Sequence, residues 1–353
     1  MNKKLFILGG SVIGFFIFVI ILLAILSSCS KKNSYDKIES KLVKAATEYV
    51  EKEGAPAIGT SIEISSDKLV EGGYIKSLDK LKNDNCYAIV KVINNGGILN
   101  YIPNLKCDNY KSLTLKEKIV NDNLTTKNAG LYYDDGVYIF RGKGVHNYIK
   151  VNNTLYRIIR IDESGDLKLI MTTHDKDEVV WDNKYNDIEN SRVGENDYLT
   201  SSMWEYLHSS YVGYSESYKK HIIPKTICVG GRYSYNVEIN DINDCSETLD
   251  NQYVSLILPS DYSQASLDKD CTAITNANCT NYNYMVYTLY STWTLNRALD
   301  NSYQVVYYKD GDFNIKSASN KSYVQIVIYI SGDELYSTGN GTEDNPYILK
   351  NVK

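Results

Sequence analysis

The sequence predicts an α+β protein with an N-terminal transmembrane helix, a small helix-plus-antiparallel-sheet unit and a larger mixed α+β domain. Three observations predict it: an uncharged stretch near the N-terminus, a helical pattern followed by two strands, and many short strands after residue 127. The 353 residues exceed the roughly 100 to 200 of one domain. We therefore expect an anchor at 1–29, a first unit at 30–127 and a second unit at 128–353.

The first element is a hydrophobic helix that can cross a bilayer. Leu5 to Leu26 is 22 residues long and carries no charge, and about 20 such residues span the hydrocarbon core. Lys3 and Lys4 favour a cytoplasmic N-terminus, because positive charge stays inside. Lys31 and Lys32, beyond the stretch, weaken this asymmetry. Orientation therefore needs a second argument.

Cysteine usage supplies that argument. Six of the seven cysteines fall into three pairs that are local in sequence, without a CxxC unit or a histidine at zinc-ligand spacing. Disulfides in an oxidising compartment are the better interpretation, and each could stabilise the fold by roughly 3 kcal/mol. The disulfide candidates are Cys86, Cys107, Cys228, Cys245, Cys271 and Cys279. We therefore expect the bulk of the chain outside the cytoplasm.

Cys29 follows the hydrophobic stretch and admits two interpretations. Leu26 to Cys29 resembles the lipobox of bacterial lipoproteins, in which the chain is cut before the cysteine and the thiol is lipidated. The apolar run is longer than the roughly 7 to 15 residues of a cleaved signal, which favours an uncleaved signal anchor. Lipidation at Cys29 and anchoring by the helix both leave the same mass outside the membrane.

The first unit combines one amphipathic helix with one hairpin. Apolar residues recur at three- and four-residue steps from Tyr35 to Glu53, and Gly54 ends the run. Two strands flank Asn95-Gly96, a hairpin turn signal. Folding about that turn brings Cys86 and Cys107 nearly opposite each other, so we expect a bridge between them.

This layout resembles type IV pilin-like and pseudopilin-like proteins of Gram-positive bacteria. Those proteins carry a Gly-Phe cleavage junction with Glu at the fifth mature position, whereas Gly14-Phe15 is followed here by Val19. The departure argues against polymerisation into a pilus.

The larger unit begins after a polar stretch, Lys111 to Asn128, that is interpreted as a connector. Helices are predicted around Leu199 to Leu207 and from Ser215 to Ile222. Alternation in Tyr156 to Ile161 is imperfect but typical of a strand. The predicted strands are Val137–Arg141, Asn147–Val151, Leu155–Ile161, Leu167–Met171, Tyr253–Leu258, Val286–Leu295, Gln304–Lys309, Phe313–Lys316, Tyr323–Ile330 and Tyr347–Leu349.

Four stretches of this unit resemble a functionally uncharacterised extracellular domain of Gram-positive bacterial surface proteins. They are Tyr138–Gly142, Leu155–Ile161, Tyr290–Leu295 and Gly339–Ile348, and the resemblance covers residues 130 to 350. It implies a distant likeness to the sulfatase-modifying-factor and C-type-lectin-like folds. Members usually carry a Gly-Val-Arg-Pro element where Val324–Val327 stands here, so any role of that arginine is missing.

No catalytic constellation stands out. The four histidines lie in no HExxH or GxSxG motif. The acidic loops near Asp177 and Asp241 match no EF-hand, and the tryptophans fit a core.

The net charge of -5 and the spread of the 38 Lys and Arg argue against a nucleic-acid partner. The 32 tyrosines suit a contact surface, although an AT-rich genome explains them equally well.

We therefore expect a membrane-anchored cell-surface protein with a non-catalytic binding, adhesion or structural role, and predict no cofactor and no metal. Its ligand would be an extracellular glycan, a peptide or an envelope protein. The competing hypotheses are an extracellular enzyme acting on cell-wall or glycan material and a pseudopilin-like component of a secretion or pilus assembly.

Overall fold

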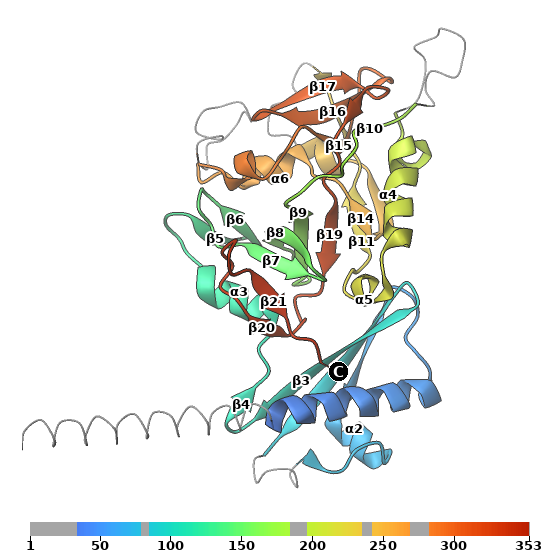
Figure 1. The fold of residues 1–353 in the computed structure, drawn as a ribbon, viewed down its shortest axis with the longest axis vertical. Coiled ribbons are helices and arrows are strands. Elements are labelled where there is room, and N and C mark those ends of the chain that lie inside the picture. The colour runs from blue at the N-terminus through green and yellow to red at the C-terminus, as the bar shows by residue number, and fades with distance from the viewer. Residues whose placement is uncertain (1–33, 79–84, 184–195, 235–241, 269–281, 353) are drawn as a thin grey trace, which may run out of the picture.

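Helices and mostly antiparallel sheets alternate along the chain and confirm the α+β class (Figure 1). The structure is a computed structural model that describes residues 34–78, 85–183, 196–234, 242–268 and 282–352. Within these ranges no helix is both long and apolar enough to span a bilayer. The predicted transmembrane stretch, Leu5 to Leu26, and Cys29 lie outside them.

The first unit is a helix that lies across a four-stranded antiparallel sheet (Figure 1). The described part of this helix covers residues 34–53, as the apolar periodicity predicts. The sheet has the order β1-β2-β3-β4. The bounds are Ser61–Ser65 for β1, Ser66–Glu71 for the short helix α2, Tyr87–Asn95 for β2, Ile98–Cys107 for β3 and Tyr110–Lys111 for β4.

One face of the first helix is buried against this sheet. Ile38, Leu42 and Ala46 share a core cluster with Val90 and Val92 of β2. The helical residues repeat at four-residue steps and the strand residues at two-residue steps, so each element presents one apolar face. A fully buried aliphatic side chain contributes about 1.5 to 3 kcal/mol, which makes this cluster the main support of the unit.

The predicted hairpin and its bridge are confirmed. Asn95 pairs with Ile98 across Gly96 and Gly97, which both have positive φ, as a tight hairpin turn requires. The register carries on to the far end of the two strands, where a disulfide joins the predicted pair, Cys86 and Cys107.

The stretch expected as a connector contains a helix, α3 (Leu115–Asn123). Thr114 and Glu117 form a capping box at its start. Leu115 and Ile119 are fully buried in the core of the larger unit. The polar composition concealed the helix because only these few positions face the core.

A nine-stranded sheet is the centre of the larger unit. Its order is β14-β19-β9-β8-β7-β21-β20, with β6 pairing β8 and β5 pairing β6, and only β21 and β7 run parallel. The bounds are Gly130–Asp134 (β5), Val137–Arg141 (β6), Tyr148–Val151 (β7), Thr154–Ile161 (β8), Leu167–Met171 (β9), Val254–Ser255 (β14), Val327–Ile330 (β19), Tyr336–Thr338 (β20) and Tyr347–Leu349 (β21).

A second sheet, β12-β15-β16-β17, and two strand pairs complete the unit. The strands are Val179–Val180 (β10), Lys225–Cys228 (β11), Gly231–Arg232 (β12), Thr248–Gln252 (β13), Thr292–Ala298 (β15), Gln304–Lys309 (β16), Asp312–Ser317 (β17) and Lys321–Ser322 (β18). The helices are Tyr198–Thr200 (η3), Ser202–Gly213 (α4), Glu216–Lys219 (α5), Ile242–Cys245 (η5), Pro259–Gln264 (α6) and Tyr284–Tyr287 (η6). Helix α6 lies between the two sheets (Figure 1).

Three of the predicted strands extend by several residues beyond the observed ones. In Tyr253–Leu258 only β14 is strand, Val286–Leu295 begins in η6 instead of strand, and β19 forms only the last part of Tyr323–Ile330. Leu256 and Leu258 are nevertheless buried. A short apolar run reports burial but does not distinguish a strand from another buried segment.

The loop 331–335 after β19 joins the two units. Lys91 of β2 forms an ion pair with Asp333, with 2.6 Å between Nζ and Oδ2. The buried carboxylate of Glu334 accepts a hydrogen bond of 2.6 Å from Asn100 of β3 and lies 2.6 Å from the ring nitrogen of His221. A small apolar cluster beside them contains Ile93, Ile102, Ile223 and Leu335. The units therefore share an interface with both apolar and ionic contacts.

Candidate ligand-binding site

Three side chains form a row across the large sheet: Arg160 of β8, Lys168 of β9 and Tyr329 of β19. Arg160 pairs with Lys168, and Lys168 pairs with Tyr329, so the three lie on one face. The register shifts between Ile158 and Arg160, which leaves Ile159 as an extra residue. This β-bulge re-aims Arg160 into the row, because regular pairing would set Ile159 opposite Lys168.

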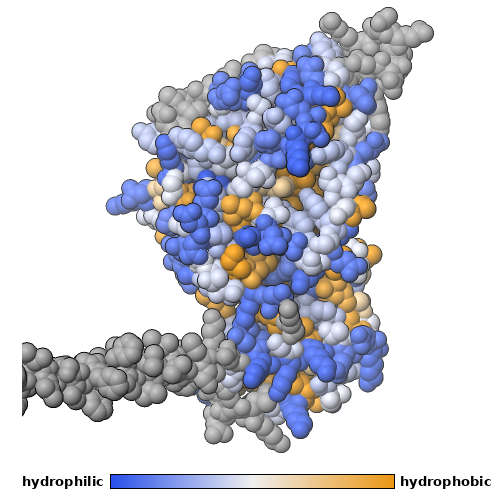
Figure 2. All heavy atoms as spheres, in the orientation of Figure 1, coloured by the Kyte–Doolittle hydropathy of each residue, from blue (hydrophilic) through white to orange (hydrophobic). Residues whose placement is uncertain are grey.

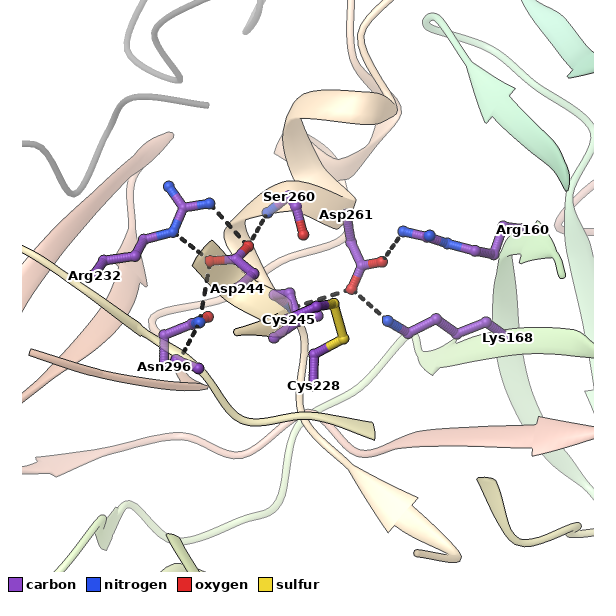
Figure 3. Close-up of a disulfide and its surroundings, with 11 residues drawn as sticks. Arg160, Lys168, Cys228, Arg232, Asp244, Cys245, Ser260, Asp261 and Asn296 are labelled. Atoms are coloured by element: carbon purple, nitrogen blue, oxygen red, sulfur yellow. Dashed lines mark hydrogen bonds and ion pairs between the residues drawn. A yellow bond between two sulfur atoms is a disulfide. The ribbon is translucent and has the colours of Figure 1, made fainter. Parts of the chain in front are cut away.

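The carboxylate of Asp261, in α6, faces the two cations of this row (Figure 3). Asp261 is fully buried and accepts hydrogen bonds from Lys168 Nζ at 2.7 Å, from Arg160 Nη2 and from the Leu258 backbone N–H at 3.1 Å. Burial alone would raise the pKa of Asp261, but Lys168 and Arg160 outweigh it and hold the pKa below its ordinary value. Asp261 is therefore ionised at neutral pH.

A disulfide and a second buried ion pair form the neighbouring wall. Cys228 of β11 is bonded to Cys245 of η5. Arg232 donates to Asp244 through Nε at 2.6 Å and Nη2 at 2.8 Å, and both residues are buried. Asn296 and a backbone N–H at the start of α6 also donate to Asp244 (Figure 3). The segment that carries the disulfide is thereby fixed above the sheet.

A pocket of about 460 Å³ lies between the row and this wall. Its polar lining includes Arg160, Lys168 and Gln264, and its apolar lining is Ile227, Leu256, Leu258, Leu295 and Tyr329. Among the described residues, Arg160 Nε and Gln264 Oε1 are buried without a hydrogen-bond partner. One donor and one acceptor of the lining residues thus lack a hydrogen-bond partner in the described part of the chain.

The charges of the pocket suit binding better than proton transfer. Arg160 and Lys168 oppose the single charge of Asp261, which leaves an excess of one positive charge, while Arg232 and Asp244 cancel. A general acid near neutral pH needs a raised pKa, whereas the pKa of Asp261 is lowered. The site can therefore hold an anionic group, and Asp261 is not suited to act as a general acid there.

Known proteins give no further guide to the site. No protein-family model, curated protein or solved structure matches this chain. The resemblances drawn from sequence therefore stay predictions.

The predicted cysteines divide between described and undescribed parts of the chain. Cys86–Cys107 and Cys228–Cys245 are disulfides, which confirms two of the three local pairs. Cys271 and Cys279, like Cys29, lie outside the described residues. Of the described pairs, only Cys228–Cys245 lines the pocket.

The other singled-out residues are dispersed. Trp181 and Trp293 are fully buried, as predicted for core residues, and Trp204 stacks on His208. Asp175 accepts a hydrogen bond from Tyr206. Within the described ranges no three His, Cys, Asp or Glu side chains are grouped to hold a metal. Asp187 and Asp241 lie outside those ranges.

Sequence reasoning missed Arg160, Lys168 and Asp261. The one available signal was the imperfect alternation in Tyr156 to Ile161, where the bulge lies. Asp261 follows a Pro-Ser pair 93 residues after Lys168, and no local pattern indicates that contact. These residues form a site only through the packing of α6 on the sheet.

Proposed function

We propose that this chain is a membrane-anchored cell-surface protein that binds an extracellular ligand without transforming it, and that the pocket over Arg160 and Lys168 is its binding site. The observation that carries the proposal is this pocket, in which the buried Lys168 and the half-buried Arg160 exceed in charge the one carboxylate that faces them, Asp261. Ligand pockets typically measure about 300 to 1,000 Å³ and contain a few convergent polar groups in an apolar lining.

The compartment is supported by two independent features. Disulfides persist mainly outside the cytoplasm, and the part of the chain that the structure describes contains two, one in each unit. The uncharged stretch from Leu5 to Leu26 precedes the first unit directly. An anchor of this kind, through the helix or through lipid on Cys29, would display both units at the membrane surface.

The face drawn in Figure 2 has no broad apolar surface for docking. Hydrophilic residues cover most of the face in Figure 2, and the hydrophobic residues there form separate groups. On that face, a specific ligand contact is better placed in a pocket where polar and apolar groups converge than on the outer surface.

Two other functions are distinguishable alternatives. An extracellular enzyme acting on cell-wall or glycan material would need an acid or nucleophile, and the lowered pKa of Asp261 gives that hypothesis less support. A pseudopilin-like component fits the helix laid over a four-stranded sheet, but Val19 replaces the family's glutamate.

The test is a binding and cleavage screen with the full-length chain in detergent micelles. Immobilised glycans, peptidoglycan and peptides are incubated with the protein, and the supernatants are analysed by mass spectrometry. Saturable binding without cleavage products is expected. Reproducible cleavage by the protein, absent from a heat-denatured sample, would overturn the proposal in favour of the enzyme hypothesis.

The variant that tests the position of the site is Thr226→Trp, which is designed to block the pocket. Thr226 lies at the pocket and its side chain is exposed, so an indole there is expected to block the pocket while the fold is retained. Loss of binding in this variant assigns the ligand to the pocket. Unchanged binding would place it on another surface.

A further inference from the structure

We propose that the pocket binds the C-terminal carboxylate of a peptide whose last side chain is aliphatic. This inference rests on the proposed binding function and names the chemistry of its ligand. It is carried by the charge of the pocket, by its unfilled hydrogen-bonding atoms and by its apolar lining.

Arg160, Lys168 and Asp261 together carry a net charge of +1, which an anionic ligand would neutralise. Arg160 gives Asp261 a hydrogen bond through Nη2, and Lys168 gives it one through Nζ. A guanidinium has five N–H donors and an ammonium has three, so each cation retains donors for a second carboxylate. The planar fork of an arginine matches a carboxylate in a bidentate arrangement. A ligand carboxylate would also neutralise the excess positive charge.

The unfilled atoms match the end of a peptide. Arg160 Nε is a donor and Gln264 Oε1 is an acceptor, and both are buried without a partner among the described residues. Buried polar atoms are almost always hydrogen-bonded in native proteins. Both atoms are covered by their surroundings, so each side chain must rotate to present Arg160 Nε to the carboxylate of a peptide terminus and Gln264 Oε1 to the N–H of its last peptide bond.

The apolar lining separates a peptide from an acidic sugar. Ile227, Leu256, Leu258 and Leu295 form a hydrocarbon wall beside the cations. An aliphatic side chain would gain from burial against that wall, whereas the hydroxyl groups of a uronic acid would lose hydrogen bonds wherever they face it. Only the polar part of the lining, which includes Thr226, Ser255 and Ser260, could accept those hydroxyl groups. The volume of about 460 Å³ is sufficient for a terminal residue and the peptide bond before it.

The experiment compares two probes that differ only at the carboxylate. Acetyl-Ala-Ala-Leu with a free C-terminus and its carboxamide are titrated into the full-length chain in detergent micelles by calorimetry. The free acid is expected to bind saturably and at least about tenfold more tightly than the amide, because charge-assisted hydrogen bonds are lost in the amide.

Arg160→Met is the main variant and Arg297→Met is its matched control. Arg297 also forms an ion pair with a carboxylate, that of Glu247, and its side chain is 28% exposed against 21% for Arg160. Arg297 does not line this pocket. Arg160→Met should weaken the free acid at least about tenfold and abolish its advantage over the amide, while Arg297→Met should change neither.

A second variant keeps the test valid if Arg160→Met does not fold. Gln264→Met removes the unfilled acceptor without removing a charge, and it should weaken acid and amide by the same factor. Equal affinities of the wild-type chain for acid and amide would overturn the inference, as would full affinity in a folded Arg160→Met variant.

Two results separate this inference from the proposed function. Binding of oligogalacturonate but of neither peptide would overturn the peptide assignment and retain the binding function. A ligand found in the broad screen whose binding survives Thr226→Trp would end the inference and the assignment of the binding site to the pocket, and would retain the binding function itself. Failure of every probe in both experiments would remove both.

Discussion

Buried arginines in the larger unit are stabilised in two different ways. Arg232 has a bidentate carboxylate partner in Asp244. Arg157 instead lies between the rings of Tyr148 and Tyr284, with its guanidinium carbon 4.3 and 4.5 Å from the ring centroids. Burial lowers the pKa of Arg157, and cation–π contacts and neutral oxygen acceptors partly compensate for that loss of solvation. Each buried cation thus depends on particular partners.

At this scale we predict that Asp261→Asn destabilises the protein strongly. The substitution leaves the cation of Lys168, whose side chain is 6% exposed, without a charged partner, and breaking a buried ion pair costs about 3 to 5 kcal/mol. Urea unfolding measures the loss.

The matched control is Asp134→Asn, which breaks the ion pair with Arg141. Asp134 is 55% exposed, and exposed pairs contribute at most about 1 kcal/mol. Similar losses in the two variants would contradict the role given to Asp261.

Among the elements, the β-bulge in β8 and the segment bonded through Cys228–Cys245 determine the site. The bulge sets Arg160 beside Lys168, and the disulfide holds η5 close to β11. A backbone N–H at the start of α6 donates a hydrogen bond to Asp244 of η5, which contributes to holding Asp261 opposite the two cations. Local irregularities therefore shape the pocket more than the regular strands do.

We expect the double variant Cys228→Ser, Cys245→Ser to lower the free energy of unfolding by about 3 kcal/mol, because a loop of 17 residues is no longer closed in the unfolded chain. Chemical denaturation without reductant measures the change. Non-reducing peptide mass spectrometry of the wild type provides the control. Free thiols at both positions there would refute the bridge itself.

In the molecule as a whole, charged contacts tie the two units and the C-terminal segment together. Lys350 forms ion pairs with Asp36 and Glu39 of the first helix and so joins the C-terminal segment to the first unit. Within the larger unit, Lys225 bridges Asp162 and Asp166. Burial opposes the charged forms, but the carboxylates outweigh it and raise the pKa values of Lys350 and Lys225. Burial alone would raise the pKa of Asp162, but the hydrogen bond and the positive charge of Lys225 lower it below its ordinary value.

These shifts predict how stability depends on pH. The lowered pKa values of Asp162 and Asp261 contribute stability above the unfolded value of about 3.9, which is lost as pH falls through the folded values. The raised pKa values of Lys225 and Lys350 contribute stability below about 10.4, which is lost as pH rises above the folded values. We expect a plateau between about pH 5 and 9.

Thermal unfolding from pH 2 to 11 measures this profile. Lys350→Met is the comparison variant and should flatten the alkaline limb relative to wild type, because one of the titrating pairs is gone. A melting temperature that rises as pH falls from 4 to 2 would contradict the assignment.

The sequence by itself determined the elements whose signals are local. The periodicity of residues 35–53, the turn at Asn95-Gly96 and the pairing of Cys86 with Cys107 depend on neighbours along the chain, and the structure has all three. Burial of Trp181 and Trp293 followed from the size of the side chain.

Only the tertiary structure decided the extent of several strands, the burial of α3 and the site. Arg160 and Lys168 meet because of a one-residue bulge, and Asp261 reaches them from 93 residues further along the chain than Lys168. Such contacts follow from packing over long sequence separations, which composition and periodicity do not encode. The elements can therefore be predicted from the sequence, whereas the pocket forms only through the tertiary structure.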